Sequence, residues 1–419
     1  MGSTESPRRR VVVTGLGAIT PVGNDVPTYW QSLLAGKSGV ARLAAFDTGD
    51  LDVQIGAEVK GFDAGQRLDP KLAKRSDRFT QFALCAADEA IRDARLELEQ
   101  EDRDRVGVIV GSGMGGVQTW ETQFAQFIAK GPRRVSPLLI PMMIPDMACG
   151  HIAISHGLRG PNYDTTSACA SGAHATGVAF RHIAIGDAEV MITGGAEAAI
   201  TRFTVAAFAN MGALSKRNPE PEKASRPFDK DRDGFVIAEG AGIYVLEELE
   251  HARRRGAPIY CELVGYGATA DGYHITAPDP EGRGAINVMR IAINDAGLKP
   301  EGIDYVNAQG TSTPLNDASE VKALLEVFGE HSRKLVVNST KSMVGHGLGS
   351  AGAMEFVAMA LQVKHGRVHP TVNHEAPDDG VHLDFVKGAA RDVAIRAAIS
   401  NSFGFGGHNA CLAVKAFPA

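Results

Sequence analysis

Two segments, one in each half of the chain, repeat the same local plan, and this constrains the fold more than any other feature. Tyr163 to Ile185 contains TTSACASGAHA, and Val336 to Leu361 contains NSTKSMVGHGLGSAGA. Each pattern predicts a short strand, a polar loop and a helix of small residues. We infer an internally duplicated α/β architecture in which the two equivalent loops meet at one site.

Other parts of the chain alternate between the same two kinds of element. Short apolar runs predict strands at Val11–Thr14, Val106–Val110, Glu189–Thr193, Tyr260–Gly267 and Gly302–Asn307. Longer amphipathic stretches predict helices at Arg78–Leu96, Ala173–Ile185 and Ala285–Ala296. We expect the halves to meet near residue 256, as 1–256 and 257–419. Gly15-Leu16-Gly17 is interpreted as a turn at a strand end.

Composition excludes several classes of function. A net charge of -6 and a pI near 6.1 argue against nucleic-acid binding, which needs a basic surface. Five cysteines without a CxxC pair argue against a disulfide framework or a zinc site, and they favour the cytoplasm. The sequence contains no apolar run long enough to span a membrane, and Met1 to Arg10 is interpreted as a disordered polar leader.

Cys169 is the candidate nucleophile. It follows Asp164-Thr-Thr-Ser-Ala, at the point where a predicted strand turns into a predicted helix. Unpaired N–H groups at a helix N-terminus stabilise a thiolate, so we expect a lowered pKa for this thiol. An isolated cysteine is more often a small buried apolar residue, and that description is expected to fit the other four, Cys85, Cys149, Cys261 and Cys411.

The ordered motifs resemble those of the β-ketoacyl-[acyl-carrier-protein] synthases. The resemblance rests on TTSACASG together with SRPFDKDRDGF from Ser225, NAQGTSTP from Asn307, KSMVGH from Lys341 and NSFGFGG from Asn401. It implies a thiolase-like fold of two duplicated αβαβα halves in five layers. It also implies decarboxylative condensation of a Cys-bound acyl chain with malonyl-carrier protein, as in the elongating type II enzymes of fatty-acid or polyketide synthesis.

The resemblance assigns reactive roles to matching positions. Cys169 would accept the acyl group, and its backbone N–H with that of Phe405 would form the oxyanion hole. His346 would donate a hydrogen bond to the malonyl thioester carbonyl. Lys341, with Glu355, would set the electrostatics of the site.

Further positions would bind the substrates. Thr311 and Thr313 would hold the pantetheine arm, Met114 would lie along the acyl pocket, and Phe403 and Phe405 would contact or gate the second substrate. The family's chemistry requires no metal and no organic cofactor. The implied partners are the acyl carrier protein and a second copy of the chain in a homodimer.

Gln309 departs from the family pattern. Elongating members carry a histidine at this position, whereas glutamine can donate a hydrogen bond but cannot act as a general base. We therefore expect near-normal acyl transfer and slow condensation. A member that has kept only acyl transfer is the first alternative function.

A basic cluster lies at Lys71, Lys74, Arg75 and Arg78, at helical spacing on an otherwise acidic chain. Such clusters are usually solvated surface. In the resembling family the matching region contacts the acidic carrier protein, which a positive patch would attract.

Two other interpretations compete with an elongating synthase. A non-decarboxylating thiolase is disfavoured because thiolases use a second cysteine where this chain has His346 and Gly406-Gly407-His408. A non-catalytic partner subunit of the chain-length-factor type is disfavoured because such subunits lack the nucleophile, whereas Cys169, His346 and Lys341 are all present here.

Overall fold

The computed structural model describes residues 8–418. The predicted leader therefore lies outside the described residues, apart from its last three arginines. These are ordered by ion pairs, Arg8 with Asp295 at 2.8 Å and Arg10 with Glu262 at 2.6 Å. For Arg8 to Arg10 the prediction of disorder is wrong, because acidic side chains of both halves meet them.

Within residues 8–418, eleven strands form one sheet in the order β12-β10-β9-β14-β15-β8-β1-β7-β6-β4-β5, in which β12 is the two-residue strand Asp384–Phe385. The bounds of the ten longer strands are β1 Val11–Ile19, β4 Val106–Gly111, β5 Asn162–Thr165, β6 Val190–Glu197, β7 Gly240–Glu248, β8 Cys261–Ala270, β9 Tyr305–Asn307, β10 Val336–Asn338, β14 Ala397–Gly404 and β15 His408–Ala416. The order β5-β4-β6-β7-β1 recurs as β10-β9-β14-β15-β8. The two sets join where β1 pairs antiparallel with β8 through Val11, Val12 and Val13.

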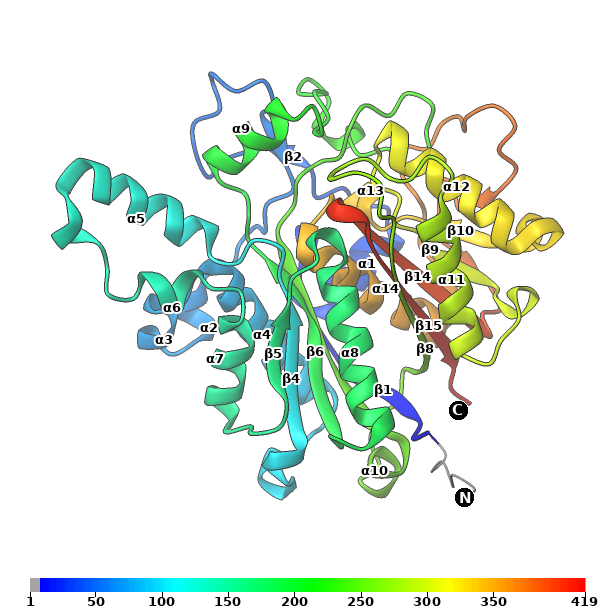
Figure 1. Cartoon of the computed structure of the whole chain (residues 1–419), viewed down its shortest axis with the longest axis horizontal. Coiled ribbons are helices and arrows are strands. Elements are labelled where there is room, and N and C mark those ends of the chain that lie inside the picture. Colours follow the sequence, from blue (N-terminus) through cyan, green and yellow to red (C-terminus); the bar gives the residue numbers. More distant parts are fainter. Residues whose placement is uncertain (1–7, 419) are drawn as a thin grey trace.

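Helices cover both sets of strands and also separate them, which gives five layers (Figure 1). The outer helices of the first half are α4 (Arg78–Asp93) and α7 (Met147–His156), and those of the second half are α11 (Arg283–Asp295) and α12 (Pro314–Phe328). Between the half-sheets lie α8 (Ser171–Ile185) and α14 (Ala351–His365). The duplicated α/β arrangement inferred from the sequence is what the chain adopts.

The two central helices begin in the same way. The 3-10 turn η4 (Ala168–Ala170) precedes α8, and the 3-10 turn η8 (Leu348–Ser350) precedes α14. Ala168 and Leu348, the first residues of these turns, both have left-handed backbone angles, with φ of 52° and 51°. Such angles are rare for residues other than glycine and occur where the surrounding structure fixes the backbone. We call these two strand-to-helix turns the first and second elbow.

Gly15 and Gly17 lie inside β1, so their interpretation as a strand-end turn is wrong. The strand continues to Ile19. A Cβ atom on Gly17 would lie 1.9 Å from the carbonyl oxygen of Ala86, and one on Gly15 would lie 2.1 Å from that of Ala90. The two glycines therefore let α4 approach the strand backbone closely, a packing role that is compatible with extended structure.

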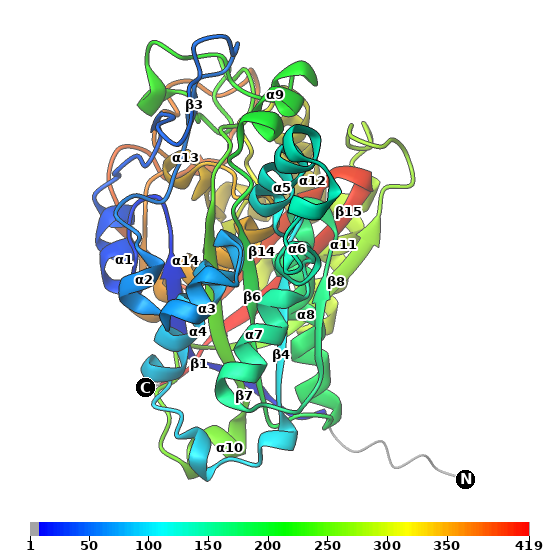
Figure 2. The same cartoon turned by 90° about the vertical axis from the view of Figure 1, so that its left-hand side faces the viewer.

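Two further observations concern the helices. α5 (Val117–Lys130) stands out from one side of the molecule in Figure 1, and this side faces the viewer in Figure 2. No helix within residues 8–418 combines the length and apolar character needed to cross a membrane.

Candidate active site

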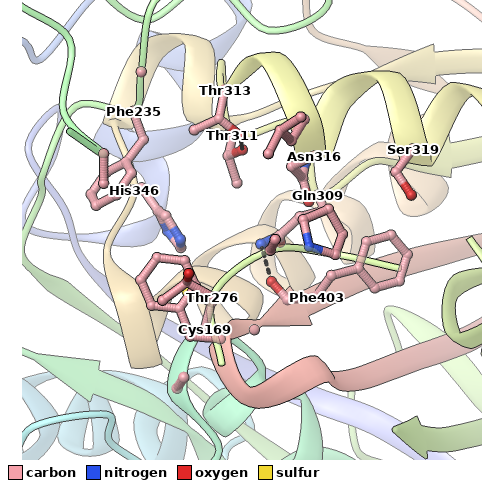
Figure 3. A pocket seen from close by; sticks show the side chains of 18 of the residues that line it. Cys169, Phe235, Thr276, Gln309, Thr311, Thr313, Asn316, Ser319, His346 and Phe403 are labelled. Atoms are coloured by element: carbon pink, nitrogen blue, oxygen red, sulfur yellow. Dashed lines mark hydrogen bonds between the residues drawn. The ribbon is translucent and has the colours of Figure 1, made fainter. Parts of the chain in front are cut away.

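A pocket of about 450 Å³ is lined by residues of both halves. Figure 3 shows Cys169, His346 and Gln309 around the same space, with Thr311 and Thr313 on the side away from Cys169. The pocket contains eight of the residues predicted from the sequence, Met114, Cys169, Gln309, Thr311, Thr313, His346, Phe403 and Phe405. Segments distant in sequence therefore meet as the duplication predicts.

Cys169 lies in the first elbow and is 8% exposed. Burial raises the pKa of its thiol to about 11, while the Lys341 charge and the Phe405 backbone N–H act to lower that pKa. The expectation of a lowered pKa is therefore wrong, because desolvation outweighs the positive neighbours. All five cysteines are buried. What distinguishes Cys169 from the other four is its place in the lining of the pocket.

His346 is buried beside the pocket and is held in one tautomer. The backbone N–H of Leu348 donates to its Nδ1 at 3.3 Å, so the ring proton of the neutral imidazole is on Nε2. Burial lowers the pKa of His346 well below its usual value, and the nearby Lys341 lowers it further. The Phe235 ring packs edge-on against the imidazole, with ring centroids 5.2 Å apart. His346 is thus a neutral hydrogen-bond donor at Nε2.

Lys341 provides the buried cation of the site. Its Nζ donates to Glu355 Oε1 at 2.6 Å and to Gln309 Oε1 at 3.0 Å, and both charged side chains are 1% exposed. Burial raises the pKa of Glu355 to about 7, against the effect of Lys341. Neither charged residue lines the pocket, so the pair acts through its neighbours. The pairing of Lys341 with Glu355 implied by the resemblance is present in the structure.

The amide of Gln309 has only one possible orientation. Its Oε1 accepts from the ammonium of Lys341, which has no acceptor, and its Nε2 donates to the carbonyl of Phe403 at 2.7 Å, which has no donor (Figure 3). One N–H of the amide is then left without an assigned partner. Gln309 is 1% exposed. It can therefore supply one neutral donor to a group in the pocket.

The turn Gly404-Phe405 closes the pocket beside Cys169. A Cβ atom on Gly404 would lie 3.0 Å from the Cys169 backbone nitrogen, so only glycine permits this approach. The approach places the Phe405 N–H against the Cys169 sulfur. Thr311 and Thr313 share a hydrogen bond of 2.9 Å between their hydroxyls.

Two buried carboxylates that organise the pocket, Glu320 and Glu197, were not predicted from the sequence. Glu320 accepts from the backbone N–H groups of Gln309 at 2.9 Å and Gly310 at 2.8 Å. Glu197 accepts from the loop that carries Met114 and from the second elbow. The sequence contains one signal for Glu197. It is an acidic residue at the end of the apolar strand Val190–Glu197, whereas an acidic side chain is ordinarily exposed to solvent.

The basic cluster is separate from the pocket. Lys71 and Lys74 lie in α3 (Pro70–Lys74), Arg75 caps its C-terminus, and all three are exposed. Arg78 does not share their helix. It begins α4 and pairs with the buried Glu239 at 2.7 Å, so the grouping of four basic residues is wrong for this one.

Comparisons with known proteins cover both halves of the chain. Family models for the N-terminal and C-terminal domains of β-ketoacyl synthases match residues 8–252 and 260–375. A 3-oxoacyl-[acyl-carrier-protein] synthase 2 of Synechocystis sp. is 52% identical over 410 residues, 98% of this chain and 99% of that protein.

Solved structures show the same relation. A β-ketoacyl synthase of Burkholderia phymatum is 35% identical with a TM-score of 0.91, and the match covers 98% of this chain and 100% of that one. A ketosynthase in complex with its type II polyketide acyl-carrier protein is 33% identical with a TM-score of 0.91, over 98% and 100% of the two chains. The predicted thiolase-like fold is thereby confirmed.

The buried thiol predicts a specific pH dependence of alkylation. Because the pKa of Cys169 is about 11, its thiolate fraction should rise about tenfold for each pH unit between pH 6 and 9. We expect the rate of iodoacetamide labelling at Cys169, followed by peptide mass spectrometry, to rise over this range without a plateau. A plateau near pH 7 would contradict this, because it would mean that the helix N-terminus outweighs desolvation.

Proposed function

The chain belongs to the β-ketoacyl synthase family, and from that premise we propose that it is an elongating 3-oxoacyl-[acyl-carrier-protein] synthase of fatty-acid synthesis. The observation that carries this proposal is the meeting of Cys169, the Nε2–H of His346 and the free N–H of Gln309 in one pocket. Family-model bounds also support two halves, 1–256 and 257–419.

The first half-reaction is acyl transfer to Cys169. Its sulfur attacks the thioester carbonyl of an acyl-carrier protein, the new C–S bond forms, and the carrier thiol leaves with a proton. The negative charge on the carbonyl oxygen is stabilised by the backbone N–H groups of Cys169 and Phe405. Lys341, which is hydrogen-bonded to Gln309 and does not line the pocket, favours the thiolate because its charge lowers the pKa of Cys169.

The second half-reaction is decarboxylation and condensation. The bond between the malonyl Cα and its carboxylate breaks, carbon dioxide leaves, and the electron pair remains as an enolate on the thioester oxygen. His346 Nε2–H is the principal donor to this oxygen, and Gln309 is the second. The enolate carbon then attacks the acyl-Cys169 carbonyl, which releases the Cys169 thiolate. Because both donors are neutral, they stabilise the charge by fixed dipoles rather than by proton transfer.

The proposed partner is an acyl carrier protein, which brings both substrates as thioesters. Thr311 and Thr313, which line the pocket, are suited to bind the amides of the pantetheine arm. Lys71, Lys74 and Arg75 offer an exposed positive patch to the acidic carrier. The chemistry proposed uses protein groups alone, without metal or organic cofactor. A cytoplasmic location is supported by five free cysteines.

We also propose a homodimer formed across β5. This strand ends the sheet order, so one of its edges is unpaired, and Tyr163 on it is 40% exposed. α5 is connected to β5 through α6 (Leu139–Met143) and α7, and it exposes the aromatic residues Trp120, Phe124 and Phe127, with Trp120 and Phe124 stacked at 5.2 Å. An open strand edge and an exposed apolar surface are each typical of an interface between copies.

The alternative of acyl transfer without efficient condensation depends on Gln309. Replacing this residue should give an ordered series in condensation rate, with Gln309→His faster than the wild type and Gln309→Leu about a hundredfold to a thousandfold slower, because the leucine removes one preorganised donor. Condensation would be measured as 3-oxoacyl product from malonyl-carrier protein. Rapid wild-type condensation that Gln309→His does not improve would show that glutamine is a competent substitute.

Charge reversal of the basic patch tests the carrier-protein partner. Lys71→Glu, Lys74→Glu and Arg75→Glu together should raise the KM for acyl-carrier protein and leave the KM for a small acyl-pantetheine thioester unchanged. Arg254→Glu with Lys299→Glu is the matched control, since these residues are exposed elsewhere. An equal change for both substrates would assign the patch a structural role.

Sedimentation velocity tests the homodimer. The wild type should sediment as a particle of twice 44.2 kDa, and Phe124→Glu should shift the population toward the monomer because it places charge in the apolar surface. Ile291→Glu is the control, because Ile291 is similarly exposed but lies on α11. A wild-type monomer, or a dimer that Phe124→Glu leaves intact, would contradict the proposed interface.

A further inference from the structure

Glu197 is a buried carboxylate to which the reaction above assigns no role. It ends β6 and is 0% exposed. Its Oε2 accepts from the backbone N–H of Gly113 at 2.7 Å and of Gly349 at 3.0 Å. Its Oε1 accepts from the Ser112 hydroxyl at 3.1 Å and from the Met114 N–H at 3.2 Å. All four donors are neutral.

The carboxylate is required for this arrangement, and no shorter or neutral group replaces it. A carboxylate has two oxygens that only accept, so it can satisfy four converging donors, whereas an amide presents one oxygen and an NH2 group. Burial raises the pKa of Glu197 to about 7, and the four hydrogen bonds oppose that shift. Three backbone N–H groups and the Ser112 hydroxyl therefore stabilise the charged form against desolvation.

Glu197 is hydrogen-bonded both to the loop that forms the wall of the acyl pocket and to Gly349, the neighbour of the residue that orients His346. Gly113 and Met114 line the pocket beside Cys169. Gly349 follows Leu348, whose N–H fixes the tautomer of His346. The two loops touch through their backbones, since a Cβ atom on Gly349 would lie 2.2 Å from the Gly113 nitrogen. A shift of Glu197 would therefore move both loops.

We propose that Glu197 is a positioning residue that couples the acyl-pocket wall at Met114 to the orientation of His346. This inference rests on the proposed function, in which an acyl chain lies along Met114 and His346 stabilises the enolate. It makes acceptance of a long acyl chain and malonyl decarboxylation depend on one side chain that contacts neither substrate. Butanoyl transfer, which uses mainly Cys169 and the oxyanion hole, depends on it less.

Glu197→Gln tests the coupling because it keeps the size of the side chain and places an NH2 group against backbone donors. We expect transfer from dodecanoyl-carrier protein to fall about tenfold or more relative to butanoyl-carrier protein, and malonyl decarboxylation to fall by about a hundredfold, the loss expected from a small misplacement of catalytic groups. Alkylation of Cys169 by iodoacetamide should not slow, because Glu197 raises the pKa of that thiol and its removal favours the thiolate.

Glu247→Gln is the matched control. Glu247 is an equally buried strand carboxylate that accepts from His251 at 2.8 Å, away from the pocket. Its loss should lower thermal stability without changing the ratio of dodecanoyl to butanoyl transfer. If Glu197→Gln does not fold, Ser112→Ala removes one of the four hydrogen bonds and should give the same selective loss on a smaller scale.

Three results would overturn the inference: an unchanged chain-length ratio in a folded Glu197→Gln or Ser112→Ala variant, an equal loss in all reactions, or slower alkylation. Failure of the proposed function would look different, because the wild type itself would then form no 3-oxoacyl product. The chain-length ratio of Cys169 acylation tests the coupling even in that case.

Discussion

The arrangement of the site depends on the backbone-to-backbone packing of α8 and α14 between the half-sheets. A Cβ atom on Gly111 would lie 2.3 Å from the Ser171 carbonyl, and one on Gly242 would lie 2.5 Å from that of Ala353. These contacts leave no room for side chains, so the helix N-termini are fixed relative to the strands and to each other. Cys169 and His346 come from different halves, and this packing determines the space between them.

Electrostatics inside this packed region follow from one buried ion pair. Lys341 and Glu355 are nearly inaccessible to water, and burying such a pair is costly unless its remaining groups are also bonded. Gln309 accepts the second Lys341 hydrogen bond, but Glu355 Oε2 has no hydrogen-bond partner among the described residues. Burial keeps His346 neutral and the cation adds to this effect, while for Cys169 the same cation opposes the effect of desolvation on the thiol pKa. We conclude that the pair is retained for control of the site rather than for stability.

Local patterns in the sequence were sufficient for much of the fold. The repeat of strand, polar loop and small-residue helix predicted both elbows. Seven pocket residues lie in the ordered motifs that carry the family resemblance, and Met114 was assigned by the resemblance itself. Features that arise from contacts distant in sequence could not be predicted. Whether β1 ends at Gly15 or continues depends on its packing against α4. The pKa of Cys169 depends on how deeply the first elbow is buried. Arg78 forms an ion pair with the buried Glu239 and so does not belong to the exposed basic cluster. Glu197 gave only a weak signal because its donors come from loops of both halves.

The two elbows occupy equivalent places in the two halves but are used differently. Cys169 in the first elbow corresponds to Gly349 in the second, and the end of β14 at Gly404 corresponds to the end of β6 at Glu197. Each elbow therefore presents a backbone N–H group at an equivalent place. In the first, the proposed function assigns this N–H to the transient oxyanion of a thioester. In the second, the N–H of Gly349 is bonded to a carboxylate that belongs to the chain itself. The first elbow thus faces a cavity that a ligand can enter, whereas its counterpart is closed by an internal ligand and belongs to the scaffold.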